Sequence, residues 1–458
     1  MSEHEDIKTG ADPRTRFDRF VFTDRSIQGA HVELGYRLEG VGGTVDFRER
    51  IELPVDASGL EKHPAIEAAL DGLHVVGGVS YWKAACPRSV APVASMRAED
   101  VDYWNELYTF GLGEYFFRNG LSPRGRFDFV SAGSSQSLVA APKQAHGPLV
   151  LVGGGKDSAV STEVVREAGV AATLFSVGAP PWIRSAAKAA EMPHLVARRT
   201  IDPALFELNR AGAYNGHIPI SAYIAHLSLL VALIGGYDEV ITSNERSASF
   251  GNVVLDGIEI NHQWSKSLRF EQLFQSWVER KISGAPKYFS LLRPLSELRI
   301  ARAFASHERY FDAVTSCNAN FKVDGLGAPQ RWCGHCPKCV FVATILSAVL
   351  TREQMNRVFE TEVLGREDVV PMLEELLGLR AHKPFECVGT PDETLAALVL
   401  AYRAHQQDET AAMKFFVSRV LPSIDHPDAL VREALSISDE HAMPAHWKKA
   451  LDAYLVHR

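Results

Sequence analysis

Apolar and polar positions alternate along the chain near its amino terminus. Between residues 32 and 38, every second side chain is large and apolar. This alternation is typical of a strand that buries one of its faces. Similar short segments lie on either side, so we expect an antiparallel meander. Its predicted strands are Arg19–Phe22, His31–Leu38 and Val45–Leu53.

Helical and strand-like patterns follow the meander. We predict a helix over His63–Leu73 that ends near Gly72, then a strand over Val75–Lys83 and a helix over Glu99–Asn119. The last helix has an aromatic face that either packs in the core or lines a substrate pocket. Residues 1–15 carry many charges and little apolar surface, so we expect them to be disordered. Ser131–Gly147 is rich in small and polar residues and is predicted to be a linker.

From Pro148 onward, short apolar runs alternate with helical segments. This order favours a parallel sheet with helices on both faces. Ligands bind such sheets beyond the carboxyl ends of the strands, so we expect Ser176–Gly178 and Ser243–Glu245 at one rim. The predicted strands are Leu149–Val152, Ala171–Val177, Leu195–Arg199 and Glu239–Ser243. The predicted helices are Ala159–Ala168, Trp182–Glu191 and Pro219–Ile234.

Past Val340, apolar residues recur at a spacing close to 3.6, which predicts a mostly helical region. The clearest helices cover Thr351–Val363, Arg366–Leu377, Thr394–Arg403 and Thr410–Val420. A chain of this length is expected to form two or three domains. We predict an N-terminal α+β domain over residues 1–146, a central α/β catalytic domain over 147–350 and a helical region over 351–458.

Composition places the chain among ordinary globular proteins. Its 458 residues are 46% hydrophobic and 23% charged. The formal net charge of −8 argues against non-specific nucleic-acid binding, which needs a basic surface. The longest apolar stretch, Ala222–Ile234, is too short to span a bilayer, and the polar, acidic amino terminus does not resemble a signal peptide. We therefore expect a cytoplasmic protein with a small-molecule substrate and no nucleic-acid or membrane partner; its oligomeric state is not indicated.

The most informative segment is the end of the first predicted parallel strand. Its glycines, Gly153, Gly154 and Gly155, allow a tight turn that brings backbone N–H groups close to a ligand. Ser158 is expected at the N-cap of the next helix, where free N–H groups and the helix dipole favour an anion. Lys156 adds a positive charge, and Asp157 is suited to hold a hydrated Mg²⁺. The segment therefore predicts a pyrophosphate-binding loop, with Ser176 at the same rim; the alternative is a glycine-rich turn that binds nothing.

A second polar segment, Asn244–Ser267, follows the last predicted parallel strand. A long loop in this position is usually a binding loop, and the alternative is a solvated surface excursion. Its basic side chains are suited to bind carboxylates or phosphates, and its acidic and imidazole side chains to move protons. A lone histidine is nevertheless more often a structural hydrogen-bonding group. In this segment the candidates for substrate binding are Arg246, Asn252 and Lys266, and those for catalysis are Glu245, His262 and Lys266. The other candidate catalytic residues are Lys156 and Asp157 of the glycine loop and Cys387.

Four of the six cysteines form a candidate metal site: Cys317, Cys333, Cys336 and Cys339. In a reducing compartment such a cluster indicates a metal site rather than a disulfide framework. Four thiolates can hold a tetrahedral zinc ion, and we expect structural zinc here. An iron–sulfur cluster uses similar ligands, and a site without stable metal is the third possibility. Cys387 lies apart in Lys383–Thr390 and is either a buried free thiol or an acid–base group.

The loop Gly-Gly-Gly-Lys-Asp-Ser resembles the pyrophosphate loop of the ATP-pyrophosphatase (PP-loop) superfamily. The usual form of that loop is Ser-Gly-Gly-x-Asp-Ser, so Gly153 stands where the superfamily has a serine hydroxyl. Members cleave ATP between its α- and β-phosphates and usually transfer AMP to an oxygen of the substrate. The cysteine cluster resembles the zinc site of the 7-cyano-7-deazaguanine synthases, which are PP-loop enzymes with a shorter spacing before the second cysteine.

A resemblance to one family extends over most of the chain, from about Phe17 to about Thr394. The motifs that carry it are Gly-Val-Ser-Tyr-Trp-Lys, Gly-Leu-Gly-Glu-Tyr, the glycine loop, Asn-Glu-Arg-Ser-Ala-Ser, Asn-His-Gln-x-Ser-Lys-Ser, the cysteine cluster and Lys-Pro-Phe-Glu-Cys-Val-Gly. Together they resemble the UDP-N-acetyl-α-D-muramoyl-L-alanyl-L-glutamate epimerases (MurL) of peptidoglycan precursor synthesis. The resemblance implies a central domain like the adenine nucleotide α-hydrolases. It also implies inversion of the terminal L-Glu to D-Glu with ATP and Mg²⁺.

On this resemblance we hypothesise that the glutamate carboxylate is adenylated, inverted at Cα and released by hydrolysis. Adenylation makes the α-proton far more acidic, because the carboxylate no longer places a second negative charge beside the carbanion. The loop residues Gly153–Ser158 would serve the phosphates and Mg²⁺. Glu245, His262 and Cys387 are the candidate acid–base groups, and the sequence does not choose among them.

Three other functions fit parts of the same pattern. An amide- or nitrile-forming synthase would use the same adenylate on a small carboxylate, but no glutaminase domain that would supply ammonia is evident. A tRNA-modifying adenylase is disfavoured by the acidic net charge. A regulator that only senses nucleotide would not account for the polar residues of Asn244–Ser267.

Overall fold

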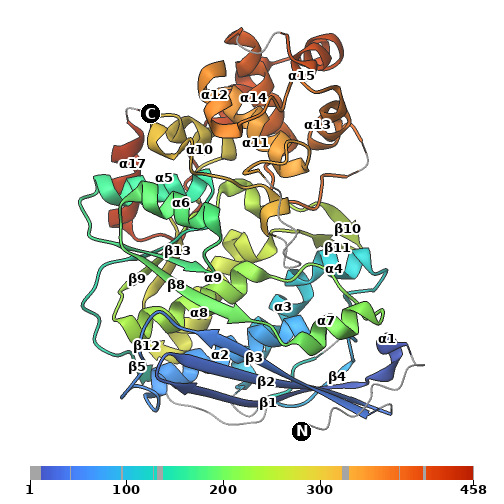
Figure 1. Cartoon of the computed structure of the whole chain (residues 1–458), viewed down its shortest axis with the longest axis vertical. Coiled ribbons are helices and arrows are strands. Elements are labelled where there is room, and N and C mark those ends of the chain that lie inside the picture. Colours follow the sequence, from blue (N-terminus) through green and yellow to red (C-terminus); the bar gives the residue numbers. More distant parts are fainter. Residues whose placement is uncertain are drawn as a thin grey trace.

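A mixed nine-stranded sheet organises the fold, in the strand order β13–β9–β6–β7–β8–β3–β2–β1–β4 (Figure 1). The computed structural model describes residues 12–456 and 458, apart from residues 42, 94–95, 127, 132–137, 322–329, 381 and 406–408. The strands of this sheet are β1 (Arg19–Gln28), β2 (His31–Gly40), β3 (Gly43–Glu52), β4 (Ser89–Val90), β6 (Leu149–Leu151), β7 (Thr173–Val177), β8 (His194–Thr200), β9 (Glu239–Thr242) and β13 (Lys287–Ser290).

The predicted meander and the predicted parallel sheet are both confirmed, and they form one continuous sheet. β1, β2 and β3 pair antiparallel. β8, β7, β6, β9 and β13 pair parallel. The two parts join where β3 pairs antiparallel with β8, at Arg50–Glu52 and Arg198–Thr200. The sheet therefore crosses the domain boundary expected at residue 146, and that boundary stays a prediction.

Helices cover both faces of the parallel strands, as the βαβα pattern predicts. Neighbouring strand residues face opposite sides: Leu149 packs in one hydrophobic core, whereas Val150 packs in the other. The first core contains α2 (Pro64–Trp82), α3 (Ala98–Gly111), α8 (Ile220–Gly235) and α9 (Leu268–Lys281). The second contains α5 (Lys156–Glu167), α6 (Pro181–Ala190), α10 (Glu297–Phe304) and α17 (Ala445–Leu455).

The carboxyl-terminal region is helical, as predicted. Its helices extend the second core and lie at the opposite end of the molecule from the meander (Figure 1). They are α11 (Pro337–Ser347), α12 (Arg352–Phe359), α13 (Val370–Leu376), α14 (Pro391–Arg403), α15 (Ala411–Phe415) and α16 (Pro427–Ala434). The other α-helices and strands of the described residues are α1 (Pro13–Arg16), α4 (Gly113–Arg118), α7 (Pro203–Arg210), the hairpin β10 (Val253–Leu255) with β11 (Ile258–Ile260), and the pair β5 (Val139–Ala140) with β12 (Ile282–Ser283). Among the described helices, none combines the length and apolar character that crossing a membrane requires.

Two predicted elements of the amino-terminal third differ from the structure: the strand over Val75–Lys83 and the single helix over Glu99–Asn119. The segment predicted as a strand over Val75–Lys83 belongs to α2, which continues past Gly72 to Trp82. Nearly every side chain of α2 is buried, so its apolar residues show no helical period. Gly77 is required by packing rather than by a turn, because a Cβ atom there would lie 2.4 Å from the Tyr36 hydroxyl.

The predicted helix Glu99–Asn119 is interrupted at Leu112, which separates α3 from α4. The predicted linker Ser131–Gly147 contains β5, while residues 132–137 lie outside the described part of the chain. The disorder expected over residues 1–15 falls mostly outside it as well, because the description begins at Asp12.

Candidate active site

The glycine loop lies at the carboxyl edge of the parallel strands, between β6 and α5. Gly154 has a φ of +83°, a left-handed conformation that favours glycine. A Cβ atom on Gly155 would lie 2.7 Å from Ser316 Oγ, so this position requires glycine for close approach. A Cβ atom on Gly153 would meet no atom of the described chain within 4 Å, so the loop borders open space at this residue.

α5 begins at Lys156 with Gly155 as its N-cap, so the N-cap predicted at Ser158 is wrong. The extended backbone of Gly155 leads directly into the helix, and Ser158 falls within the first turn. Its Oγ atom donates to the Gly155 carbonyl oxygen over 3.0 Å. Among the described residues, no side chain caps the first N–H groups of α5. These groups can therefore serve an anion, as a pyrophosphate loop requires.

A buried ion network joins this helix to two others. Lys156 pairs with Asp157 and with Glu297, the first residue of α10. Lys338, in the first turn of α11, lies 3.4 Å from Glu297 through its Nζ atom. Burial disfavours the Glu297 carboxylate, but Lys156 and Lys338 together lower its pKa to about 2. The amino termini of α5, α10 and α11 are thus held together around one carboxylate.

Three of the candidate catalytic residues, His262, Lys266 and Cys387, come together around the Cys387 thiol. The Nζ atom of Lys266 lies 3.2 Å from Cys387 Sγ, and the His262 side chain hydrogen-bonds to the same thiol. Burial disfavours a thiolate, but Lys266 and His262 lower the pKa of Cys387 to about 5. Lys338 donates to the Cys387 carbonyl oxygen, which connects this cluster to the ion network of the glycine loop. Cys387 is therefore a thiolate at neutral pH and a suitable proton acceptor.

Glu114 of α4 holds the other side of His262. Its carboxylate pairs with His262 Nδ1 and with Arg118, and His217 Nδ1 lies 3.7 Å away. Burial lowers the pKa of His262, yet Cys387 and Glu114 outweigh burial and raise it to about 9. The imidazolium therefore lies between two anions. The ligand atoms of Glu114, His217 and His262 lie within 4.8 Å of one another, and burial lowers the pKa of His217 to about 3, so its imidazole is neutral.

Glu245 is a buried carboxylate close to both groups of charges. Burial and Glu297 raise its pKa to about 7, against the opposing effect of Lys266. Within the described residues its carboxylate has neither a hydrogen-bond partner nor an ion pair. Arg293 fixes the backbone near both ends of the polar segment Asn244–Ser267, because it donates to the carbonyl oxygens of Glu245 and Lys266 over 2.7 and 2.6 Å.

The residues predicted to bind substrate or nucleotide are all at or near this rim, and their roles stay predictions. Ser176 Oγ donates to the Gly178 carbonyl oxygen over 2.7 Å. Asn252 links the polar loop to the Cys387 segment, since it donates to Pro384 O over 2.8 Å and accepts from the His262 N–H over 2.9 Å. Arg246 is engaged with the C-terminal region, where it lies 3.2 Å from Ser436 Oγ.

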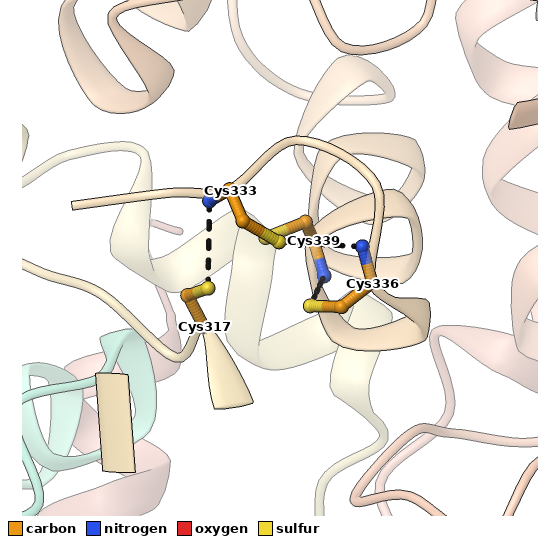
Figure 2. Close-up of side chains that lie close together, drawn as sticks. All are labelled: Cys317, Cys333, Cys336 and Cys339. Atoms are coloured by element: carbon orange, nitrogen blue, oxygen red, sulfur yellow. Dashed lines mark hydrogen bonds between the residues drawn. The ribbon is translucent and has the colours of Figure 1, made fainter. Parts of the chain in front are cut away.

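The four predicted metal ligands come together, as Figure 2 shows. The sulfur atoms of Cys317, Cys333, Cys336 and Cys339 lie within 4.8 Å of one another. Backbone N–H groups of the last three cysteines donate to the sulfur atoms of Cys317, Cys333 and Cys336, each over 3.4 Å. Zinc bonds to sulfur of about 2.3 Å in a tetrahedron imply a separation of about 3.8 Å between sulfurs. The 3.7 Å separation of the Cys333 and Cys339 sulfurs agrees with this value, so the donor set fits zinc.

The cysteine cluster also contacts both parts of the site. Thr315, two residues before Cys317, donates its N–H to the Gly154 carbonyl oxygen over 2.9 Å. Lys338, between Cys336 and Cys339, reaches Glu297 and the Cys387 carbonyl oxygen. The cluster is thus placed to support the glycine loop and the Cys387 segment at once.

Sequence reasoning missed Glu114, Glu297 and Lys338 as members of this site. Glu114 lies in the segment Gly-Leu-Gly-Glu-Tyr, which contributes to the family resemblance but has no recognisable chemical pattern. Glu297 only marks the start of a helix, after the cap at Ser296, and Lys338 is hidden between two metal ligands. Their shared signal is burial of a charge, which the sequence alone does not reveal.

Comparisons with known proteins give one consistent result. The MurL N-terminal domain family matches residues 11–291, and the MurL C-terminal domain family matches residues 313–429. A curated UDP-N-acetyl-alpha-D-muramoyl-L-alanyl-L-glutamate epimerase of Xanthomonas oryzae pv. oryzae is 42% identical over 86% of this chain and 87% of its own length. Proteins of the same name from Salinispora tropica and a Micromonospora species are 43% identical over 84% of the chain and 85% of their sequence, and 40% identical over 95% and 98%, respectively. No solved structure gave a significant match.

Proposed function

The chain belongs to the MurL family, and from this premise we propose that it epimerises the terminal L-glutamate of UDP-N-acetyl-α-D-muramoyl-L-alanyl-L-glutamate to D-glutamate. The curated relatives carry the name of this activity and align over most of the chain. The enzyme is accordingly an isomerase of peptidoglycan precursor synthesis. The central sheet would be a PP-loop domain that uses ATP and Mg²⁺.

The observation that carries the proposal is the continuous network from Lys156 through Glu297 and Lys338 to Cys387. One end of this network is a loop with the features of a pyrophosphate site. The other end is a buried thiolate with a cation and an imidazolium beside it. A carboxylate activated at the first end would therefore present its α-carbon to a base at the second.

Activation of the carboxylate answers a chemical difficulty of the reaction. Removing the α-proton from a free carboxylate would place two negative charges on adjacent groups. We propose that a carboxylate oxygen attacks the α-phosphorus of ATP, so that the bond to the β-phosphate breaks and pyrophosphate leaves. The loop N–H groups and Lys156 would stabilise the phosphate charge, and Asp157 would bind Mg²⁺, which supplies further charge neutralisation.

Inversion needs one group that removes the proton and another that returns it on the opposite face. Cys387 and Glu245 suit these roles, because near neutral pH one is ionised and the other is partly protonated. The Cys387 thiolate would take the α-proton, and the Glu245 carboxyl group would return a proton to Cα. Water then cleaves the mixed anhydride, which releases AMP and the carboxylate. His262 and Lys266 would hold the charge of Cys387 rather than react themselves.

The test is an incubation of the purified protein with ATP, Mg²⁺ and the UDP-muramoyl dipeptide in D₂O. We expect AMP and pyrophosphate, deuterium at the glutamate Cα and a D-Glu product. AMP without deuterium would mean that another nucleophile captures the adenylate, as in an amide- or nitrile-forming enzyme. No consumption of ATP would contradict the adenylation step.

A further inference from the structure

Lys383 is the lysine of this region whose charge has no partner within the described structure. Its side chain is 9% exposed, and its ammonium group makes neither a hydrogen bond nor an ion pair with any described residue. The other buried lysines of the site are paired: Lys156 and Lys338 with Glu297, and Lys266 with Cys387.

An isolated ammonium group is unfavourable in the interior of a protein. Its removal from water is compensated only by an anion and by hydrogen bonds, and otherwise the group tends to lose its proton. Burial lowers the pKa of Lys383, and the carboxylates of Glu393 and Glu245 only partly oppose this effect. Within the described residues the Nζ atom of Lys383 has no partner, yet it is not completely enclosed, so a bound anion can approach it and supply that partner.

The backbone around Lys383 is fixed, so the unpaired charge does not result from a loose segment. Asn252 Nδ2 lies 3.4 Å from the Lys383 carbonyl oxygen and 2.8 Å from that of Pro384. Lys338 holds the same segment at the Cys387 carbonyl oxygen. Cys387 and Glu245 are among the groups that act electrostatically on Lys383. The ammonium group is thus close enough to the two proposed acid–base groups to be affected by their charges.

The other basic side chains at this rim are already engaged. Lys266 pairs with the Cys387 thiolate, and Arg246 contacts Ser436 of the C-terminal region. Glu245 is likewise buried without a partner, yet it forms no ion pair with Lys383. Within the described residues, both side chains therefore keep polar atoms that a ligand can contact.

We propose that Lys383 binds an anionic oxygen of the ligand, either of the dipeptide substrate or of the ATP phosphates. The assignment of the ligand rests on the proposed function, whereas the unpaired buried cation does not. In this position Lys383 fixes the reacting group beside Cys387 and Glu245. Lys383 is thus a ligand-binding residue within the motif Lys-Pro-Phe-Glu-Cys-Val-Gly, which gave no sign of this role.

The test compares the wild-type protein with Lys383→Met and Lys383→Arg, and with Lys287→Met as a control at a lysine that is 60% exposed. Binding of ATP–Mg²⁺ and of the UDP-muramoyl dipeptide is measured separately by calorimetry. In Lys383→Met, loss of one charged hydrogen bond should lower the affinity for one of the two ligands by about tenfold or more. Weaker ATP binding would identify an oxygen of the ATP phosphates as the partner, and weaker dipeptide binding an anionic oxygen of the substrate. Lys383→Arg and the control should retain more affinity than Lys383→Met.

Thermal unfolding of the ligand-free proteins distinguishes a binding role from a structural one. Removal of an unpaired buried charge should leave the Tm of Lys383→Met unchanged or higher. A lower Tm with unchanged affinity for both ligands would overturn the inference. Unchanged affinity and unchanged kcat/KM in a stable variant would also overturn it. Failure of the proposed function looks different, since the wild-type protein would then show no ATP-dependent exchange at Cα. A wild-type protein that binds neither ATP nor the dipeptide would contradict both the inference about Lys383 and the proposed function.

Discussion

The Nζ atom of Lys266 lies 3.2 Å from the Sγ atom of Cys387, although 121 positions separate the two residues. Lys266 ends a 3₁₀ turn before α9, and Cys387 precedes α14. Burial lowers the pKa of Lys266, but the Cys387 thiolate and Glu245 outweigh it and raise that pKa above its usual value. The two groups therefore keep each other charged inside the protein. A buried thiolate with this support can accept a proton without an added metal ion.

Replacement of Cys387 should separate proton transfer from adenylation. We expect Cys387→Ser to lower deuterium exchange at the glutamate Cα by about 10²-fold or more, because a hydroxyl is a far weaker base than a thiolate. ATP–pyrophosphate exchange, which reports formation of the adenylate, should persist. Cys86→Ser is the matched control, since Cys86 is a buried cysteine outside the site. Full exchange at Cα in Cys387→Ser would exclude Cys387 as the base.

The pH dependence of kcat/KM should be bell-shaped, with limbs set by Cys387 and Glu245. In the L-to-D direction Cys387 must be ionised, so the rate falls as the pH drops through about 5 and the thiolate gains a proton. Glu245 must be protonated, so the rate falls as the pH rises through about 7. Glu245→Gln should lower the rate and remove the upper limb. An upper limb that persists in this variant would assign it to another group.

The sequence predicted the parts of the site whose residues are neighbours along the chain. The glycine loop, the four cysteines and the segment from Glu245 to Lys266 follow from local spacing, and the structure brings the cysteines together. Local spacing could not predict that Cys387 contacts His262 and Lys266, because this contact depends on how the C-terminal region packs. For the same reason Glu297 and Lys338 could not be identified before their charges were seen to be buried and paired.

The fold shows the same division between local and tertiary information. Alternation of apolar residues predicted the meander, and short apolar runs predicted the parallel strands. Neither pattern indicated that β3 pairs with β8, because the edges of two sheets carry no complementary sequence signal. α2 was misread since it is buried on all sides, so its glycines and β-branched residues suggested a strand.

The buried pair of Lys156 and Glu297 should contribute strongly to stability. Their side chains are 2% and 1% exposed, so removal of one partner leaves a charge uncompensated. We expect Glu297→Gln to lower the free energy of unfolding by about 3–5 kcal/mol in urea denaturation. The double variant Lys156→Met/Glu297→Gln should lose less than the sum of the single losses. The exposed pair Lys287–Glu279 is the control, where equivalent changes should have little effect. Additive losses in the double variant would mean that the two side chains act independently.

Loss of the metal should affect stability and nucleotide binding together. In Cys336→Ser one of four thiolates is missing, so we expect lower zinc content by mass spectrometry and a lower Tm. Affinity for ATP should fall as well, because Thr315 connects the segment of Cys317 to the Gly154 carbonyl oxygen. Cys387→Ser should keep its zinc, since Cys387 is not part of the four-cysteine cluster. An iron–sulfur cluster would instead give iron and visible absorption. A metal-free Cys336→Ser protein with unchanged Tm would show that the cluster is not structural. A metal that supports both the glycine loop and the Cys387 segment cannot be lost without loosening both.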